Sequence, residues 1–404
     1  MNYVTYAVPF FVLAVGCEFL FGWLTKRNTF TLADTLNSLQ LGMLSRLRGL
    51  VQLGLIGIAF GALTENFTLF ALDPGQWWVW VFAFVGYDLG YYFSHRYGHE
   101  WRILWASHVV HHQSEQYNLS TALRQTSTGW LNGIFYLPLY IIGVPVEVMI
   151  SVGSLNLIYQ FWVHTEHVGE LGVIEKIMVT PSNHRVHHAK NPMYIDKNYG
   201  GVFILWDRLF GTYQPELTDQ PCRYGITRQL QSWNPVWANV HAWLDTAQQS
   251  WQTPRLSDKI KVWFKSPAWD APGIASTPAD WQAAKFQPVT SRYGAVTSFI
   301  GFWLHVGAAF VLLSFARELS QPLVLATTAW LTFGFCVQGF VMEGRRSAVW
   351  FEWLRLVLGT ALLMWLALPE IYANLGIAYL LICAALNLGL LKTTQSADRL
   401  QSPG

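Results

Sequence analysis

Residues 77–100 read WWVWVFAFVGYDLGYYFSHRYGHE, an apolar run that passes directly into a pair of histidines. The hydrocarbon core of a bilayer is about 30 Å thick and needs about 20 mostly apolar residues per helix. Residues 77–94 approach that length. His95 and His99 lie four positions apart, so they share one face of a helix. The stretch therefore predicts a membrane helix that carries two imidazoles at its end.

The composition of the whole chain indicates the same class of protein. Hydrophobic residues make up 52% of the 404 residues and charged residues only 12%, whereas a soluble domain carries about 25% charged residues. Residues 143–145, Gly-Val-Pro, interrupt one long apolar run and predict a turn inside a hairpin. We expect an all-α fold, a polytopic integral membrane helical bundle. Its further apolar runs cover residues 3–23, 50–72, 129–163, 295–315, 322–342, 347–368 and 371–391.

The chain is expected to divide into four regions. Residues 1–76 should form N-terminal membrane anchor helices that are retained, because no small-residue cleavage site follows the first apolar run. Residues 77–215 should form a catalytic domain that holds the clustered histidines. Residues 216–293 are polar and rich in Pro, Gln, Trp and Lys, which is typical of an extramembrane connector near the headgroups. Residues 294–404 should supply the C-terminal transmembrane helices and a short tail.

Positive charges in short loops predict which side of the membrane faces the cytoplasm. Lys26, Arg27, Arg46 and Arg48 flank the first loop, which is therefore expected inside. If residues 129–163 re-enter as a hairpin, the alternation of crossings places every histidine group on the cytoplasmic face. The expected location is the inner membrane of a bacterium, or the endoplasmic reticulum if the chain is eukaryotic.

Ten of the twelve histidines lie between positions 95 and 188 in four closely spaced groups. In a helix, each pair or trio presents two imidazoles in one direction, and packing alone does not require ten imidazoles in so short a span. Imidazole binds Fe, Zn, Cu and Ni, whereas one zinc ion takes only three or four protein ligands. The set therefore predicts a dimetal site with four or five nitrogens for each ion. The candidate ligands are His95, His99, His108, His111, His112, His164, His167, His184, His187 and His188.

Three carboxylates lie near these histidines, and two of them, Asp88 and Glu100, are the candidate catalytic residues. Asp88 lies two helical turns before His95 on the same face, and an acid inside a membrane segment is by default a functional-site hypothesis. It could hold a histidine tautomer, face a polar cavity or accept a hydrogen bond from a neighbouring helix. Glu100 follows His99, and Glu166 lies inside the third group. Each could bridge metals, orient an imidazole, serve a cofactor or be an ordinary surface carboxylate.

The four histidine boxes, HRYGH, HVVHH, HTEH and NHRVHH, resemble those of the fatty acid hydroxylase and sterol desaturase superfamily. The likeness covers about residues 82–215. Residues 181–213, PSNHRVHHAKNPMYIDKNYGGVFILWDRLFGTY, and the box HRYGHE are most similar to the alkylglycerol monooxygenase family. This closer likeness extends through the SWNPVW segment to the C-terminal membrane helices.

The resemblance implies two iron ions held by the ten clustered histidines, with Glu100 beside them. It also implies O2-dependent hydroxylation of a lipid C–H bond. In the alkylglycerol monooxygenase family the reacting carbon is the one bound to the ether oxygen, and tetrahydrobiopterin supplies the electrons. Asn183, Tyr199 and Asp207 are polar residues near the last box that could bind a pterin or support the ligands by hydrogen bonds.

Other functions fit parts of the pattern. A sterol or fatty acyl desaturase or hydroxylase would keep the metals and draw electrons from a redox protein. A metal transporter or a structural metal protein would use the same imidazoles, but these gather at helix ends on one side instead of spanning the bilayer. The expected partners are a membrane lipid substrate, O2 and an external electron donor, either a pterin or a redox protein. A formal charge of +2 gives no field that indicates nucleic acid.

Overall fold

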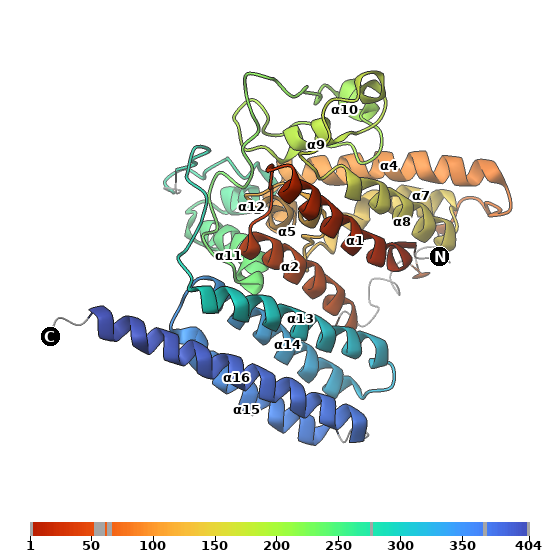
Figure 1. The fold of residues 1–404 in the computed structure, drawn as a ribbon. Coiled ribbons are helices and arrows are strands. Elements are labelled where there is room, and N and C mark those ends of the chain that lie inside the picture. The colour runs from red at the N-terminus through yellow and green to blue at the C-terminus, as the bar shows by residue number, and fades with distance from the viewer. Residues whose placement is uncertain (1–2, 52–60, 63–66, 275–277, 367–369, 402–404) are drawn as a thin grey trace. The chain divides into compact units, whose positions relative to one another are not determined.

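The computed structural model describes residues 3–51, 61–62, 67–274, 278–366 and 370–401, and within these ranges the fold is all-helical (Figure 1). The described residues form no β-strand. They contain two isolated β-bridges, which pair Met178 with Phe203 and Ala189 with Tyr224. This confirms the all-α prediction. The chain forms two compact units, which are described separately.

The first unit comprises Met1–Thr31, Gly54–Leu230 and Asn239–Ala284, and it carries the clustered histidines. It contains most of α11 (Pro235–Gln252) and two 3-10 helices, η1 (Leu131–Tyr136) and η2 (Gly172–Lys176). Its other helices are α1 (Tyr3–Leu24), α4 (Trp77–Glu100), α5 (Arg102–His112), α6 (Leu119–Ala122), α7 (Leu137–Ile142), α8 (Val146–Trp162), α9 (Pro181–His188), α10 (Leu205–Phe210) and α12 (Leu256–Phe264).

A glycine makes the predicted turn between α7 and α8. Gly143 ends α7 with φ of 112°, and a Cβ atom built there would lie 1.9 Å from the carbonyl oxygen of Phe70. Only glycine tolerates both the left-handed backbone and this close approach. Pro145 precedes α8 in an extended conformation that begins the new helix. The turn returns the chain so that α8 packs along α4.

The core between α4 and α8 is apolar, with one polar exception. Ala83 of α4 packs with Val148 and Val152 of α8, and all three are buried. Further along the same contact, Asp88 accepts a hydrogen bond of 2.7 Å from the amide group of Asn156. The helix continues without a break to Glu100, so His95 and His99 lie within α4.

The second unit comprises Leu32–Leu53, Gln231–Ala238 and Lys285–Gly404. Figure 1 shows its four long C-terminal helices packed alongside one another, and the last of them, α16, contacts both α15 and α13. A buried cluster of Leu47, Leu312, Leu331 and Phe335 joins α2 to α13 and α14. The helices of this unit are α2 (Leu32–Val51), α13 (Arg292–Phe315), α14 (Gln321–Met342), α15 (Ser347–Trp365) and α16 (Glu370–Gln401).

Five described helices are long and apolar enough to cross a membrane: α1, α13, α14, α15 and the Glu370–Thr393 part of α16. They match the apolar runs predicted from the sequence. The two helices beside the histidines fall outside this set, because α8 has only 17 residues and the second half of α4 carries tyrosines, Asp88 and the two histidines. The predicted run 50–72 lies largely outside the described residues.

Candidate metal centre

Nine of the ten clustered histidines converge in two groups, with the ligand atoms of each group within 4.8 Å of one another. The first group, named here the five-histidine group, consists of His95, His99, His108, His112 and His187. The second, named the four-histidine group, consists of His111, His164, His184 and His188. The division agrees with the four or five nitrogens per ion expected from the sequence.

Helical periodicity explains how two short helices, α5 and α9, each contribute histidines to both groups. In α5, His108 and His112 are four residues apart and face the five-histidine group, while His111 is turned toward the other group. In α9, His184 and His188 are likewise four apart and share the four-histidine group, whereas His187 faces the first. Each helix therefore lies between the two groups.

The Nε2 atoms in each group are spaced as ligands around one ion. In the five-histidine group, Nε2 of His108 lies 3.1 Å from that of His95 and 3.0 Å from that of His112. In the four-histidine group, Nε2 of His164 lies 3.2 Å from that of His111 and 3.1 Å from that of His184. For a metal–nitrogen bond of about 2.1 Å, neighbouring ligands lie about 3.0 Å apart in an octahedron and about 3.4 Å apart in a tetrahedron. The spacing fits a bound cation.

In four of these rings, Nδ1 is hydrogen-bonded to a backbone carbonyl oxygen. Nδ1 of His95 lies 2.8 Å from the carbonyl oxygen of Tyr199, and Nδ1 of His187 lies 2.9 Å from that of Lys197. A carbonyl only accepts, so Nδ1 carries the proton and Nε2 keeps its lone pair for a metal. In the four-histidine group the carbonyls of Arg124 and Gln160 accept in the same way from His111 and His164, at 3.0 and 2.8 Å.

Burial keeps three imidazoles of the four-histidine group, His111, His184 and His188, in the neutral form that metals bind. It lowers the pKa of His111 to about 4, because the charged ring would lose its hydration. The pKa values of His184 and His188 are also lowered well below the usual range for the same reason. Near pH 7 the rings therefore present lone pairs and not protons, and the donor set fits a metal ion.

The carbonyls that serve the five-histidine group belong to one shaped loop. Asp196 and Asn198 have left-handed backbones, with φ of 60° and 55°, which Asp and Asn tolerate better than most residues. The side chain of Asp207 accepts hydrogen bonds of 2.7 Å from the backbone N–H groups of Tyr199 and Gly200. It also accepts from the hydroxyl of Thr212 at 2.6 Å. Asp207 therefore fixes the loop that orients His95 and His187.

Asp88 supports the same region from inside the helix pair. Its carboxylate accepts from the backbone N–H groups of Val202 and Phe203, at 2.8 and 3.0 Å, and from the indole of Trp206 at 2.9 Å. With Asn156, this gives Asp88 four donors. Of the three roles considered for Asp88, these contacts fit the one in which it accepts hydrogen bonds from neighbouring segments. Asp88 thereby ties residues 202–203 to α4.

The remaining polar candidates lie at different places. Asn183 sits in the first turn of α9, where its side-chain oxygen is 3.3 Å from the backbone N–H of Thr180. Glu100 accepts from Arg96 at 2.8 Å, and its side chain is one-third exposed. Tyr199 is fully buried with its ring centroid 5.4 Å from that of His99. Its hydroxyl has no hydrogen-bond partner among the described residues.

His167 is not brought together with the other nine histidines. Its ring meets Phe21 of α1 edge-on, with centroids 5.1 Å apart. Residues 163–168 leave α8 as an irregular segment, so the helical spacing that would align His167 with His164 does not apply. In this geometry the HTEH box contributes one imidazole to the groups and not two.

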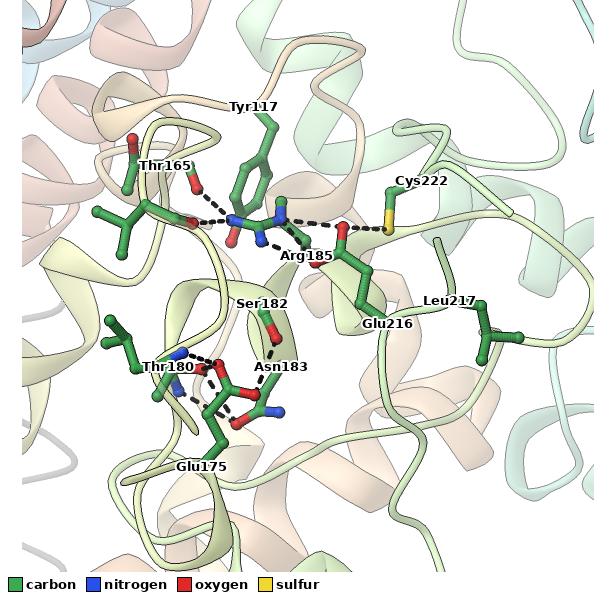
Figure 2. A network of polar contacts seen from close by, with 12 residues as sticks. Tyr117, Thr165, Glu175, Thr180, Ser182, Asn183, Arg185, Glu216, Leu217 and Cys222 are labelled. Carbon is green, nitrogen blue, oxygen red and sulfur yellow. Dashed lines mark hydrogen bonds and ion pairs between the residues drawn. The ribbon is translucent and has the colours of Figure 1, made fainter. Parts of the chain in front are cut away.

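A buried arginine in α9, Arg185, was not anticipated from the sequence. Figure 2 shows Arg185 of α9 reaching Glu216, with a shortest distance of 2.7 Å. Arg185 also donates to the carbonyl oxygens of Thr165 and Val168, at 3.0 and 2.6 Å. It therefore ties the last histidine box to the segment that follows His164. The signal in the sequence was a charged residue between His184 and His187 in an otherwise buried helix.

Similarity to known proteins, like the geometry of the histidines, indicates a metal-dependent enzyme. A family model described as fatty acid hydroxylase matches residues 80–212, which include all nine grouped histidines. Alkylglycerol monooxygenase from Danio rerio is 37% identical over 88% of this chain and 81% of that protein. The human alkylglycerol monooxygenase is 36% identical over the same shares. The chain belongs to the alkylglycerol monooxygenase family.

Membership of the alkylglycerol monooxygenase family establishes the class of enzyme. The chain is an oxygen-using monooxygenase, a lipid hydroxylase and a multi-pass membrane protein. A more distant relative, the ornithine lipid hydroxylase of Rhizobium tropici, is 30% identical over 39% of this chain and 49% of that protein. No solved structure matches the chain.

Proposed function

We propose that the chain binds two iron ions, one in each histidine group, and hydroxylates the ether-linked carbon of an alkylglycerol lipid. The observation that supports this most is the pair of converging Nε2 groups, with Nδ1 atoms held by backbone carbonyls. Nine imidazoles exceed the needs of one zinc ion and suit two ions that prefer nitrogen ligands. The similarity to alkylglycerol monooxygenases supports both the metal and the substrate.

When bound, the iron ions would supply the oxygen activation that no side chain provides. In the net reaction one oxygen atom of O2 enters the C–H bond next to the ether oxygen. The other leaves as water with two electrons and two protons from the donor. The resulting hemiacetal breaks into an aldehyde and glycerol. The contribution of the chain is to hold the imidazoles, keep them neutral and exclude water.

Tetrahydrobiopterin is the proposed electron donor, and the acidic and phenolic groups beside the five-histidine group are its proposed contacts. Glu100 is one-third exposed, so it is accessible to a soluble cofactor. Tyr199 has a buried hydroxyl that needs a partner. Asn183 has a buried side-chain N–H group with no partner among the described residues. Asp207 already accepts three hydrogen bonds, so its proposed role is to hold the loop that carries Tyr199.

We propose that both groups face the cytoplasm, where a pterin is available. Lys26 and Arg27 lie two and three residues after the end of α1, and positive charge marks the cytoplasmic side. The proposed membrane is the bacterial inner membrane, or the endoplasmic reticulum in a eukaryotic cell. The alkyl chain of the substrate would remain in the lipid while its ether carbon reaches the histidines.

The test uses the full chain purified into lipid nanodiscs. Metal analysis should find about two irons per chain, and alkylglycerol with tetrahydrobiopterin and O2 should yield aldehyde and glycerol. One zinc per chain with no iron in active protein would contradict the dimetal proposal. Turnover that requires a ferredoxin or cytochrome and ignores the pterin would instead favour a sterol or fatty acyl hydroxylase or desaturase.

A further inference from the structure

We propose that α1 is a structural arm of the four-histidine group, and that Glu18 is the positioning residue that connects it. The inference rests on the proposed two-metal site. Helix α1 has the length and composition of a membrane span, and only 11% of its apolar window is buried. Glu18 is an exception because it is only 7% exposed. An acid in such a helix is costly and needs an explanation beyond anchoring.

Glu18 uses its two carboxylate oxygens on two segments, one inside the HTEH box and the other after the HVVHH box. Its Oε1 accepts a hydrogen bond of 2.5 Å from the hydroxyl of Thr165. Its Oε2 accepts a hydrogen bond of 2.7 Å from the backbone N–H of Leu119. Thr165 directly follows His164, and Leu119 begins α6. A single side chain therefore joins α1 to both segments.

The partners of Glu18 explain why a carboxylate stands there. The Thr165 oxygen already lies 3.1 Å from the backbone N–H of His167, which donates to it. The Thr165 hydroxyl is therefore a donor toward Glu18, and the N–H of Leu119 can only donate. In this geometry each donor faces a different oxygen of Glu18, so both oxygens act as acceptors. Glutamate offers two, whereas glutamine offers one oxygen and one NH2 group.

Both segments lead to ligands of the four-histidine group. Thr165 is adjacent to His164, and its carbonyl accepts from Arg185 in α9. From Leu119 the chain passes through α6 to Arg124, whose carbonyl holds His111. The five-histidine group takes its carbonyl support instead from the loop fixed by Asp207. Loss of the Glu18 contacts should therefore weaken one group more than the other.

Other contacts place α1 against the same region. Phe11 stacks on Phe161 of α8 with ring centroids 4.1 Å apart. Phe21 meets His167 edge-on, and a Cβ on Gly22 would lie 3.4 Å from Nε2 of His167. The amide of Asn118, which caps α6, donates to the carbonyl of Thr29 at 2.8 Å. The arm therefore packs along α8 before Glu18 makes its hydrogen bonds.

The test measures iron per chain and hydrogen–deuterium exchange in full-length variants in nanodiscs. Glu18→Ala should reduce bound iron about twofold, from about two ions to one, and raise exchange in residues 163–168. Glu18→Gln should fall between wild type and Glu18→Ala, because it keeps one acceptor. Leu20→Ala is the matched control, since Leu20 lies on the same helix and is 52% exposed. It should retain wild-type iron and exchange.

A second pair of variants separates positioning from general support. Thr165→Ser keeps the hydroxyl and should retain both irons, whereas Thr165→Val should resemble Glu18→Ala. Wild-type iron and wild-type exchange in Glu18→Ala would overturn the proposal, as would loss of both irons with raised exchange throughout the chain. If wild type itself held one metal ion, the proposed function would fail. The exchange of residues 163–168 would then still decide the role of Glu18.

Discussion

The two histidine groups have similar spacing but are supported in different ways. The five-histidine group has carbonyl acceptors at Lys197 and Tyr199, two residues apart in one loop. The four-histidine group takes its acceptors from Arg124 and Gln160, which lie in separate segments. One group therefore takes its carbonyl support from a single loop, and the other from two separate segments of the chain. The second should be more sensitive to changes outside its own ligands.

The largest effects should come from removing one ligand of each group. His187→Ala takes an imidazole from the five-histidine group and His111→Ala takes one from the four-histidine group. Loss of partners behind a ligand already costs about 10- to 100-fold in metal affinity or activity, so loss of the ligand should cost at least about 100-fold in activity. Metal analysis should find about one iron in each variant. Full activity in either would contradict the grouping.

The next largest effect should follow from breaking the buried ion pair of Arg185. Arg185→Met leaves Glu216 and two carbonyls without the guanidinium donor, and because the Glu216 side chain is 21% exposed the cost should stay below the roughly 3–5 kcal/mol of a fully buried pair. Arg185→Lys should be intermediate, because lysine lacks the two-pronged geometry. Thermal unfolding measures the stability, and metal analysis should show the four-histidine group emptied first. Equal loss from both groups would mean that Arg185 supports α9 as a whole.

A smaller effect is expected from the loop that supports the other group. Asp207→Asn replaces one acceptor oxygen by an NH2 group, which faces a donor. An unsatisfied buried donor costs about 1–3 kcal/mol. The five-histidine group should lose affinity for iron about tenfold, while the four-histidine group stays occupied. Titration with a competing chelator resolves the two affinities. A selective loss from the four-histidine group would reverse the comparison.

Removal of the metals should lower the thermal stability of the protein. Metal that binds only the folded state stabilises it, so chelated protein should unfold at a lower temperature than loaded protein. In each group, Nε2 lone pairs face one another at about 3 Å, and a bound cation would offset their mutual repulsion. The exchange of α5 and α9 with deuterium should rise most, since each contributes to both groups. An unchanged unfolding temperature would contradict the metal assignment.

The sequence predicted the parts of the fold that depend on local pattern. The apolar runs ending at Trp23 and Phe315 became helices α1 and α13, because length and hydropathy decide such elements. The turn at Gly143 was also predictable, since Gly and Pro interrupt an apolar run. The number of histidines predicted a dimetal site, and their spacing predicted imidazoles that share a helix face, because helical periodicity fixes that alignment.

What the sequence could not predict depends on contacts between distant segments. The partners of Asp88 lie 68 and more than 100 residues away, at Asn156 and Val202, so its supporting position was one of several alternatives. The contacts of Arg185 and Glu18 could not be predicted either, because their partners lie in other segments of the chain. His167 was expected to align with His164. Because the helix ends at Trp162, neither residue is helical, and a spacing of three residues no longer places them on one face.

His167→Ala should have the smallest effect and is the sharpest check on the division into two groups. Its ring contacts Phe21 and lies in neither group, so its removal should cost about 1 kcal/mol or less of stability. Iron content should stay at the wild-type value, in contrast to His164→Ala, which removes a grouped imidazole from the same box. Loss of one iron from His167→Ala would mean that the HTEH box supplies two ligands, and the four-histidine group would then have to be redrawn with five.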